Sequence, residues 1–269
     1  MKTMLKLTNV CKTFNAGTSF EKAALDHVNL ELEENDFVTV IGGNGAGKST
    51  MLNAVAGVWP IDEGSIFIDG TDVTGLPDFK RAYLISRVFQ DPRNGTASDM
   101  QIEENLALAA RRGLKRGLSW NVREEDRKMY RELLSTLGLG LENRMQTKVG
   151  LLSGGQRQAL TLLMASIRKP KLLLLDEHTA ALDPKTAKLV LKLTNEIVQK
   201  NNLTTLMVTH NMRDAISLGN RLIMMDRGHV LLDVRGEEKK NLTVEDLLKK
   251  FEEASGEEFD NDQALLSKN

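Results

Sequence analysis

The chain has 269 residues, enough for one large domain or two small ones with a hydrophobic core of normal size. Its 36 Lys and Arg nearly balance its 37 Asp and Glu, which argues against a global nucleic-acid-binding surface and against an acidic disordered chain. The single cysteine, Cys11, excludes an intrachain disulfide and is predicted to face the core. Because no run of about 18 apolar residues occurs, we expect no membrane-spanning helix and no signal peptide.

Hydrophobic periodicity predicts an α/β protein with an inserted helical segment. Residues 3–41 alternate as strands, and the last of these strands ends in glycines. From about 91 to 168 the pattern becomes helical and rich in charge, with a mobile loop predicted at 113–122. Apolar strands alternating with helices then return, which predicts a mainly parallel sheet. A hairpin is predicted to turn at 226–229, and a short helix is predicted to begin at Thr243 before a loosely held acidic tail.

A phosphate-binding loop is predicted at 42–50, where GGNGAGKST fits the pattern G-x-x-x-x-G-K-[ST] between a strand and a helix. Glycines let backbone N–H groups converge on phosphate oxygens, and the helix N-terminus adds partial positive charge. We expect Lys48 to reach the β- and γ-phosphates of ATP, Ser49 to ligate Mg²⁺ and Thr50 to contact the α-phosphate. The predicted nucleotide-binding residues of this loop are Gly42, Gly43, Asn44, Gly45, Ala46, Gly47, Lys48, Ser49 and Thr50.

Two carboxylates follow the apolar run LLLL at 172–175. Alone, such a pair would usually be a solvated strand end. Combined with a phosphate loop, Asp176 is predicted to hold Mg²⁺ through water and Glu177 to polarise the attacking water.

A second glycine-rich turn, LSGGQRQ at 152–158, has neither a lysine nor a Mg²⁺ ligand of its own. It offers backbone N–H groups, a serine hydroxyl and a helix N-terminus, which suit contact with a phosphate that is already held elsewhere.

With these motifs in this order, the chain resembles the ATPase subunits of ABC transporters from about residue 4 to residue 236. Gln90 in VFQDP, the signature at 152–156, AALDP at 180–184 and His210 complete the family pattern. The resemblance implies a P-loop NTPase core at 1–90 and 169–236, with an N-terminal antiparallel β-subdomain. It also implies an α-helical signature subdomain at 91–168, and a C-terminal helix and tail at 237–269.

The resemblance also implies roles for individual residues. Gln90 would sense Mg²⁺ and the γ-phosphate, and His210 would contact the γ-phosphate and the attacking water. Phe14 stands where the family usually has a tyrosine that stacks on adenine, although it could instead fill the core.

Asp183 would contact the opposite subunit, cap a helix, or do both. The residues implied to cover the ATP of a second copy are Ser153, Gly154, Gly155 and Gln156. His178 replaces a frequent proline, and a neutral substitution is favoured over a supporting role beside Glu177.

As a family member, the chain would bind ATP and Mg²⁺ and form a homodimer at the cytoplasmic face of the membrane as a peripheral protein. Its partners would be separate permease subunits, one of whose helices contacts the surface around 91–115, and an extracytoplasmic solute-binding protein, with no nucleic acid. DEHTAALDPKTA and the segment around His210 look similar to importer ATPases associated with amino acids, tryptophan-type substrates among them.

Other functions stay open at this stage. Export of a lipid or drug fits the same motifs. A soluble ABC-type ATPase acting on DNA or ribosomes is disfavoured, because the sequence has one cassette and neither heptads nor zinc cysteines between the phosphate loop and the signature. A switch ATPase or small-molecule kinase of the P-loop class would need neither the signature nor Gln90 and His210.

Overall fold

The structure is a computed structural model that describes residues 2–114 and 122–255. Most of the predicted mobile loop and of the acidic tail lies outside the described residues. Contacts divide the described chain into two compact units. Unit 1 holds the residues up to Ile85, Lys171–Glu177 and those from Leu203 onward, and unit 2 holds Ser86–Pro170 and His178–Asn202. The subdomain limits at 90, 168 and 236 stay predictions.

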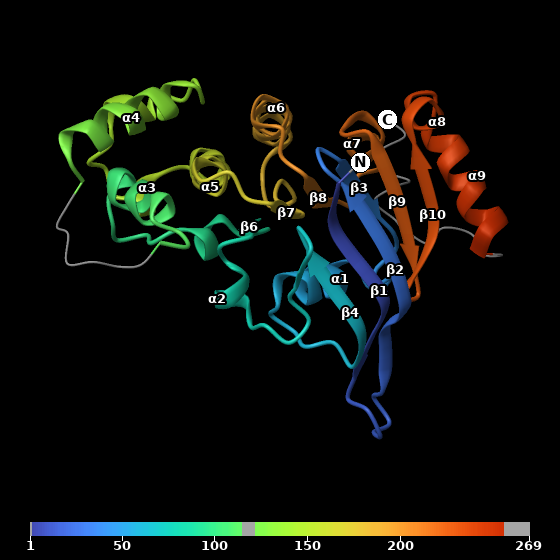
Figure 1. Ribbon diagram of the computed structural model, residues 1–269. Coiled ribbons are helices and arrows are strands. Elements are labelled where there is room, and N and C mark those ends of the chain that lie inside the picture. The colour runs from blue at the N-terminus through green and yellow to red at the C-terminus, as the bar shows by residue number, and fades with distance from the viewer. Residues whose placement is uncertain (1, 115–121, 256–269) are drawn as a thin grey trace. The chain divides into compact units, whose positions relative to one another are not determined.

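Two β-sheets carry unit 1 (Figure 1). The first has the antiparallel order β2-β1-β4-β5, with β1 (Thr3–Phe14), β2 (Lys22–Glu33), β4 (Glu63–Ile68) and β5 (Thr71–Asp72). The second has the order β10-β9-β3-β8-β7-β6, with β3 (Phe37–Ile41), β6 (Ile85–Val88), β7 (Leu172–Asp176), β8 (Thr205–Val208), β9 (Arg221–Asp226) and β10 (His229–Arg235). The chain passes into unit 2 within β6. These sheets confirm the predicted α/β fold with an antiparallel β-subdomain.

β3 lies inside the second sheet and leads directly into the phosphate loop. All five of its residues are buried, as expected for an apolar, β-branched strand covered on both faces. It pairs in parallel with β8 on one side and β9 on the other, and β7 pairs in parallel with β8. The sheet therefore places the loop at the carboxyl end of a central strand, where ligands of open α/β sheets bind.

In the described part of unit 1 there are five helices: α1 (Lys48–Ala56), α2 (Asp78–Arg81), α7 (Met212–Ser217), α8 (Gly236–Lys240) and α9 (Val244–Ser255). Buried residues of α1 such as Met51 share a core with both sheets. A separate core joins Met212 of α7 to Leu247 and Phe251 of α9 against β9. The predicted start of α9 is confirmed, because the hydroxyl of Thr243 accepts a hydrogen bond from the Asp246 N–H at 3.1 Å.

Unit 2 is mainly helical in its described part. Its elements are the short 3-10 helices Pro92–Gly95, Leu141–Asn143 and Val149–Leu151, and the helices α3 (Ile102–Ala110), α4 (Glu124–Ser135), α5 (Gly154–Ile167) and α6 (Pro184–Asn201). A glycine at 155 favours the close packing of α5 on α6, since a Cβ atom there would lie 2.0 Å from Thr186 Cγ2 and the Thr186 side chain would have to shift. Among the described residues of the chain, no helix combines the length and the apolarity needed to cross a bilayer.

The structure confirms the hairpin at 226–229 and corrects the placement of Cys11. β9 and β10 pair from Asp226 to His229, and the turn residues Arg227 and Gly228 both have positive φ, which suits the right-handed twist of a hairpin. Cys11 is partly exposed, so the prediction that it faces the core is wrong. Its neighbour Val10 is fully buried, and successive side chains of a strand point to opposite faces.

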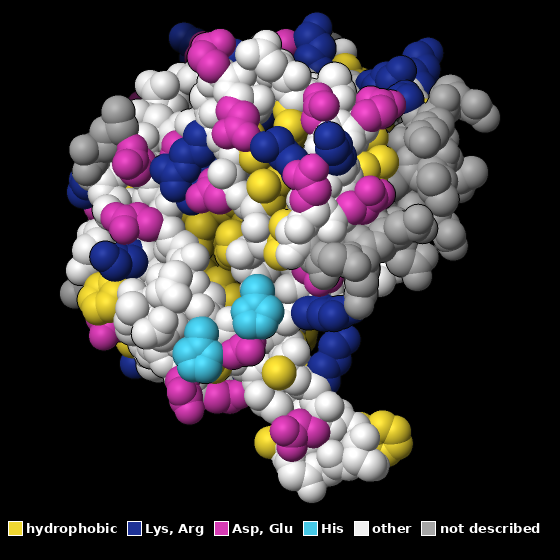
Figure 2. Space-filling view, turned by 90° about the vertical axis from the view of Figure 1, so that its right-hand side faces the viewer, with side chains coloured by type: hydrophobic (Ala, Val, Ile, Leu, Met, Phe, Trp, Pro, Cys, Tyr) yellow, Lys and Arg dark blue, Asp and Glu magenta, His cyan; other side chains and the backbone are white. Residues whose placement is uncertain are grey.

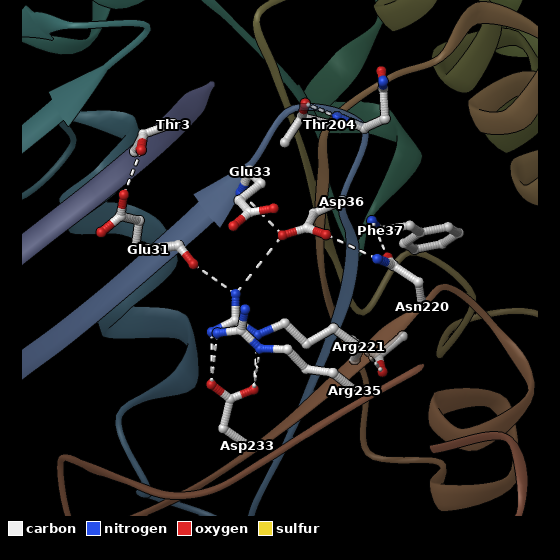
Figure 3. A network of polar contacts seen from close by, with 12 residues as sticks. Thr3, Glu31, Glu33, Asp36, Phe37, Thr204, Asn220, Arg221, Asp233 and Arg235 are labelled. Atoms are coloured by element: carbon white, nitrogen blue, oxygen red, sulfur yellow. Dashed lines mark hydrogen bonds and ion pairs between the residues drawn. The ribbon is translucent and has the colours of Figure 1, made fainter. Parts of the chain in front are cut away.

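A buried arginine fastens β9 to its neighbours (Figure 3). Arg221 is only 2% exposed, and its guanidinium donates two hydrogen bonds of 2.7 Å to the Asp233 carboxylate on β10. It also donates to the Glu31 carbonyl of β2 at 2.6 Å and lies 3.8 Å from the Asp36 carboxylate. Asn220 completes the network by donating to Asp36 at 2.8 Å. One side chain thus ties the antiparallel sheet to the edge of the second sheet.

We expect Asp233→Asn to lower the free energy of unfolding by about 1 to 3 kcal/mol, because the buried Arg221 guanidinium loses its charged, bidentate partner. The loss is limited because the Asp233 side chain is 33% exposed. Urea unfolding followed by circular dichroism measures this change. The matched control is Arg235→Gln, which removes the exposed arginine on the same carboxylate and should cost less than about 1 kcal/mol. Equal effects of the two substitutions would contradict the importance of the buried pair.

Candidate functional site

The phosphate loop is shaped by two close backbone approaches within unit 1. Gly42 has φ 152° and Gly47 has φ 98°. A Cβ atom on Gly42 would lie 2.2 Å from the Met225 carbonyl oxygen, and one on Gly47 would lie 2.4 Å from the Ala24 carbonyl oxygen. Both positions therefore exclude any residue but glycine, and the loop forms a cradle of backbone at the N-terminus of α1.

Lys48, the first residue of α1, turns back over this loop. Its side chain is 7% exposed, and Nζ donates to the carbonyl oxygens of Gly42 at 2.8 Å and Gly43 at 2.9 Å. Burial lowers the pKa of Lys48, while the Glu177 carboxylate acts in the opposite direction. The backbone carbonyl oxygens thus hold the ammonium at the mouth of the loop.

A pocket of about 250 Å³ opens on the loop. Most of the residues that the sequence predicts to bind nucleotide line it, and it adds two lining residues, Lys22 and Ala24, that sequence reasoning missed. Its lining is Phe14, Lys22, Ala24, Asn44, Gly45, Ala46, Gly47, Lys48, Ser49, Thr50 and Glu177. The structure thereby brings the loop, the aromatic ring of Phe14 and the carboxylate of Glu177, the residue after β7, together in one cavity.

Glu177 and His210 stand at the ends of neighbouring parallel strands. β7 pairs with β8 up to Asp176 and Val208, and the Glu177 N–H donates to the Val208 carbonyl at 3.0 Å. Glu177 has φ 43°, a left-handed conformation that is uncommon for a residue with a side chain. Its Oε2 lies 3.4 Å from His210 Nδ1. The chain leaves β7 at Glu177, and the side chains of Glu177 and His210 contact each other beyond the ends of β7 and β8.

The two groups shift one another's titration. The hydrogen bond to His210 is the main cause that lowers the pKa of Glu177, against the effect of burial. The same contact with Glu177 is the main cause that raises the pKa of His210. Near neutral pH the carboxylate is therefore charged, as a group that polarises water must be.

The residues predicted to hold Mg²⁺ offer oxygen donors, the type that this ion prefers. Ser49 is exposed in the first turn of α1, and Asp176 is half-buried at the end of β7, both in unit 1. Gln90 belongs to unit 2, where it is exposed two residues after the end of β6. The hydroxyl of Ser49 and the carboxylate of Asp176 are suitable donors for a divalent cation, and the assignment of these residues and Gln90 to Mg²⁺ stays a prediction.

Phe14 ends β1 and is half-buried. Its ring meets Trp59 edge to face, with centroids 5.0 Å apart and planes at 82°, and Lys12 Nζ lies 5.6 Å from its centroid. Because it also lines the pocket, Phe14 presents aromatic surface to a base as well as to Trp59. Stacking on adenine stays a prediction.

In unit 2, the signature turn is the start of α5 and is built as a reciprocal cap. The Ser153 hydroxyl accepts from the Gln156 N–H at 3.3 Å, and the Gln156 side chain accepts from the Ser153 N–H at 3.2 Å. Such a capping box fixes the first turn of a helix. Ser153 and Gly154 are exposed, so the turn is accessible from outside unit 2.

Gln158, the last residue of LSGGQRQ, has a contact that sequence reasoning missed. It is fully buried, and its Nε2 donates to the Phe89 carbonyl at 3.0 Å, one residue before Gln90. The signature helix is therefore hydrogen-bonded to the backbone that carries Gln90. The glutamine within the motif was the available signal, but its partner lies 69 residues away in sequence.

Asp183 and His178 both have structural partners in unit 2. The carboxylate of Asp183 accepts from the Thr186 N–H at 3.1 Å and caps α6, so the capping alternative is confirmed. His178 is 1% exposed, and its Nε2 lies 2.9 Å from the Thr194 hydroxyl. Burial lowers the pKa of His178 to about 4, which keeps the ring neutral at physiological pH.

Several known proteins are similar to this chain. Residues 25–180 match the family described as ABC transporter. A tyrosine transport ATP-binding protein of Clostridioides difficile is 46% identical over 251 residues, which cover 93% of this chain and 100% of that protein. A methionine import ATP-binding protein of Rhizobium johnstonii is 35% identical over 231 residues, 85% of this chain and 60% of that protein. A dimeric ATP-binding cassette, MJ0796, bound to ADP and Pi in a post-hydrolysis state, superposes with a TM-score of 0.73 at 33% identity, covering 86% of this chain and 98% of that one.

The Glu177–His210 contact should contribute to stability only in a limited pH range. The raised pKa of His210 adds stability that is fully present below 6.5 and is lost as the pH rises through the folded-state value. The lowered pKa of Glu177 adds stability that is present above 4.5 and is lost as the pH falls through its folded-state value. The coupling should therefore be stronger near pH 6 than near pH 9.

A double-mutant cycle with Glu177→Gln and His210→Gln, measured by urea unfolding at both pH values, isolates this coupling. We expect less than about 1 kcal/mol at pH 6, because both side chains are partly solvated, and a smaller value at pH 9. A coupling energy that is unchanged between the two pH values would contradict the ion pair.

Proposed function

Because the chain belongs to the ABC transporter family of ATPases, we propose that two copies form an ATP-driven pair that powers amino-acid import through separate permease subunits. The observation that carries this proposal is the pocket in which the phosphate loop and Glu177 face one cavity, with His210 beside Glu177. The family is one of ATP-hydrolysing proteins, and the related cassette bound to ADP and Pi shows that its site holds nucleotide.

For hydrolysis, the chain supplies positioning and charge. The backbone cradle between Gly42 and Gly47 holds the phosphates, and Lys48 exchanges its contacts with loop carbonyls for contacts with phosphate oxygens. Glu177 orients and polarises the attacking water, and His210 keeps the Glu177 side chain directed into the pocket. Phosphoryl transfer needs little beyond such placement and charge stabilisation.

Mg²⁺ would be held by the oxygen donors of Ser49, Asp176 and Gln90, and when bound it neutralises charge on the β- and γ-phosphates. Gln90 would report the presence of this ion to unit 2. The support is its place after Phe89, whose carbonyl is bonded to Gln158 of the signature helix. A change at Gln90 would thereby reach α5.

The signature turn of each copy would cover the ATP of the other. Ser153 and Gly154 are exposed, and the capped start of α5 presents N–H groups that suit a γ-phosphate. Asp183 would meet the opposite copy while it caps α6. ATP that contacts both copies favours the closed pair, and hydrolysis removes this preference. Dimerisation is supported by the dimeric state of the related cassette.

A small groove on unit 2 would receive a helix of the permease. It has a volume of about 170 Å³ and is lined by Met100, Glu104, Ala107, Leu108, Arg111 and Val122. Leu108, on α3, is 52% exposed in it. Apolar surface between charged side chains suits the apolar face of an amphipathic helix. The groove overlaps the surface around 91–115 that the sequence indicates.

The cargo would be an amino acid, tyrosine- or tryptophan-type, delivered by an extracytoplasmic solute-binding protein. The tyrosine transport and methionine import relatives support import of amino acids over export of a lipid or drug. The ATPase would then lie at the cytoplasmic face of the membrane, and the permease and binding protein would select the cargo.

The shared site is tested by mixing two inactive chains. Lys48→Ala should remove phosphate binding, and Ser153→Arg should block the turn that covers the partner's ATP, so each variant alone should lose ATPase activity. Mixing should restore a measurable fraction, because one mixed pair contains one site with both halves intact. The control is Glu177→Gln, which should lower the rate by roughly 10²- to 10⁴-fold. No mixing partner should restore the site at the phosphate loop of the Glu177→Gln chain, because each chain supplies the carboxylate of its own site. Absence of any recovery on mixing would contradict two independently active shared sites.

The groove and the direction of transport are tested in proteoliposomes with the permease and binding protein. Leu108→Asp should abolish ATP-dependent tyrosine uptake while the basal ATPase activity of the isolated chain stays within about twofold, because Leu108 does not line the phosphate-loop pocket. The matched control is Leu189→Asp, an equally substituted leucine of α6 that is 39% exposed outside the groove. Uptake that survives Leu108→Asp would contradict the groove, and ATP-dependent extrusion would contradict import.

A further inference from the structure

Three neighbouring strands of the first sheet bring a thiol, an imidazole and a carboxylate together. Cys11 of β1 is the register partner of Glu63 of β4. On the other side of β1, β2 contains an extra residue: Val10 pairs with Val28 and Lys12 with Leu25, which leaves Asp26 and His27 opposite Cys11. One donor atom each of Cys11, His27 and Glu63 lies within 4.8 Å of the other two.

We propose that Cys11, His27 and Glu63 form a binding site for a transition-metal cation of the Zn²⁺ type. Thiolate, imidazole and carboxylate are the three ligand types of protein zinc sites, whereas Ca²⁺ and Mg²⁺ take oxygen donors. Three protein ligands leave a coordination position for water. The side chains of His27 and Glu63 are exposed and Cys11 is partly exposed, so a cation reaches the site from solvent.

Hydrogen bonds around the cluster orient two of the proposed ligands, His27 and Cys11. His27 Nδ1 lies 2.5 Å from Asp26 Oδ1, and a ring N–H that donates to a carboxylate leaves the other ring nitrogen, Nε2, with its lone pair available for a metal. The backbone N–H of His27 donates to Cys11 Sγ at 3.3 Å, which holds these two ligands side by side. Such a carboxylate behind a histidine is the usual outer support of a zinc-bound imidazole.

The same carboxylate joins a second histidine, which serves as an internal control. Asp26 Oδ2 lies 3.3 Å from His229 Nε2 at the start of β10. Figure 2 shows histidine side chains gathered with acidic side chains on one face of the molecule. His229 is not part of the three-residue cluster, so its removal separates the proposed site from a general affinity of this face for metals.

A metal ion bound to Cys11, His27 and Glu63 would link the three strands β1, β2 and β4. Because Phe14 lies three residues beyond Cys11 on β1, the linked sheet is the one that presents Phe14 to the phosphate-loop pocket. A ligand that binds the folded state raises its stability, so the metal should raise the melting temperature. The site uses none of the residues of ATP hydrolysis.

Titration of the full, EDTA-treated chain with Co²⁺ tests the proposal. We expect one Co²⁺ per chain with a thiolate-to-metal charge-transfer absorption in the near ultraviolet, which added Zn²⁺ removes. Cys11→Ser should abolish the absorption, and since Cys11 is the chain's one cysteine, the signal reports this site alone. His27→Gln and Asp26→Asn should each weaken binding by about 10- to 100-fold, and Glu63→Gln should weaken it as well.

His229→Gln should leave the affinity within about twofold. Circular dichroism checks that each variant is folded, and Zn²⁺ should raise the melting temperature of the unchanged chain but not that of Cys11→Ser. The proposal is overturned if no charge-transfer band appears at one equivalent. It is also overturned if His229→Gln removes the band while His27→Gln keeps it.

Discussion

Two backbone contacts of the phosphate loop, to the carbonyl oxygens of Met225 and Ala24, leave no space for a Cβ atom at Gly42 or Gly47. Met225 belongs to β9 and Ala24 to β2, so the loop is held between strands of the two sheets of unit 1. These close backbone contacts restrict movement of the loop when a charged ligand binds. Its N–H groups are therefore preorganised, which is the property that phosphate binding and phosphoryl transfer require.

The buried Arg221 network acts on the same two strands. Arg221 is the first residue of β9 and donates to the Glu31 carbonyl of β2, so it fixes the start of β9. Met225, whose carbonyl contacts the loop, lies near the end of the same strand. The bidentate contact with Asp233 adds β10 to this frame. A polar network away from the pocket thus helps to hold β9, the strand that supplies the Met225 carbonyl. Stability of the sheet and geometry of the site depend on one set of contacts.

The sequence predicted well those features of the fold that have a local cause. The glycines of the loop, Asp176 and Glu177 after an apolar strand, and Asp183 before a proline each form a local pattern with a local physical cause. The Arg221 network and the bond from Gln158 to Phe89 were missed because their partners lie far apart in sequence and only the fold brings them together. Cys11 was misplaced because composition suggests a buried thiol, whereas the alternation set by Val10 turns it outward.

The cap of α5 uses some of the N–H groups of the signature turn and leaves others. The first residues of a helix have N–H groups without partners inside the helix. The capping box uses those of Ser153 and Gln156, so the two that it does not use belong to Gly154 and Gly155. In the proposed pair these are the N–H groups that meet the partner's phosphate. Gly155 is also the residue whose missing Cβ lets α6 pack against α5. The contact that positions Asp183 on α6 and the surface that would cover ATP therefore depend on the same glycine.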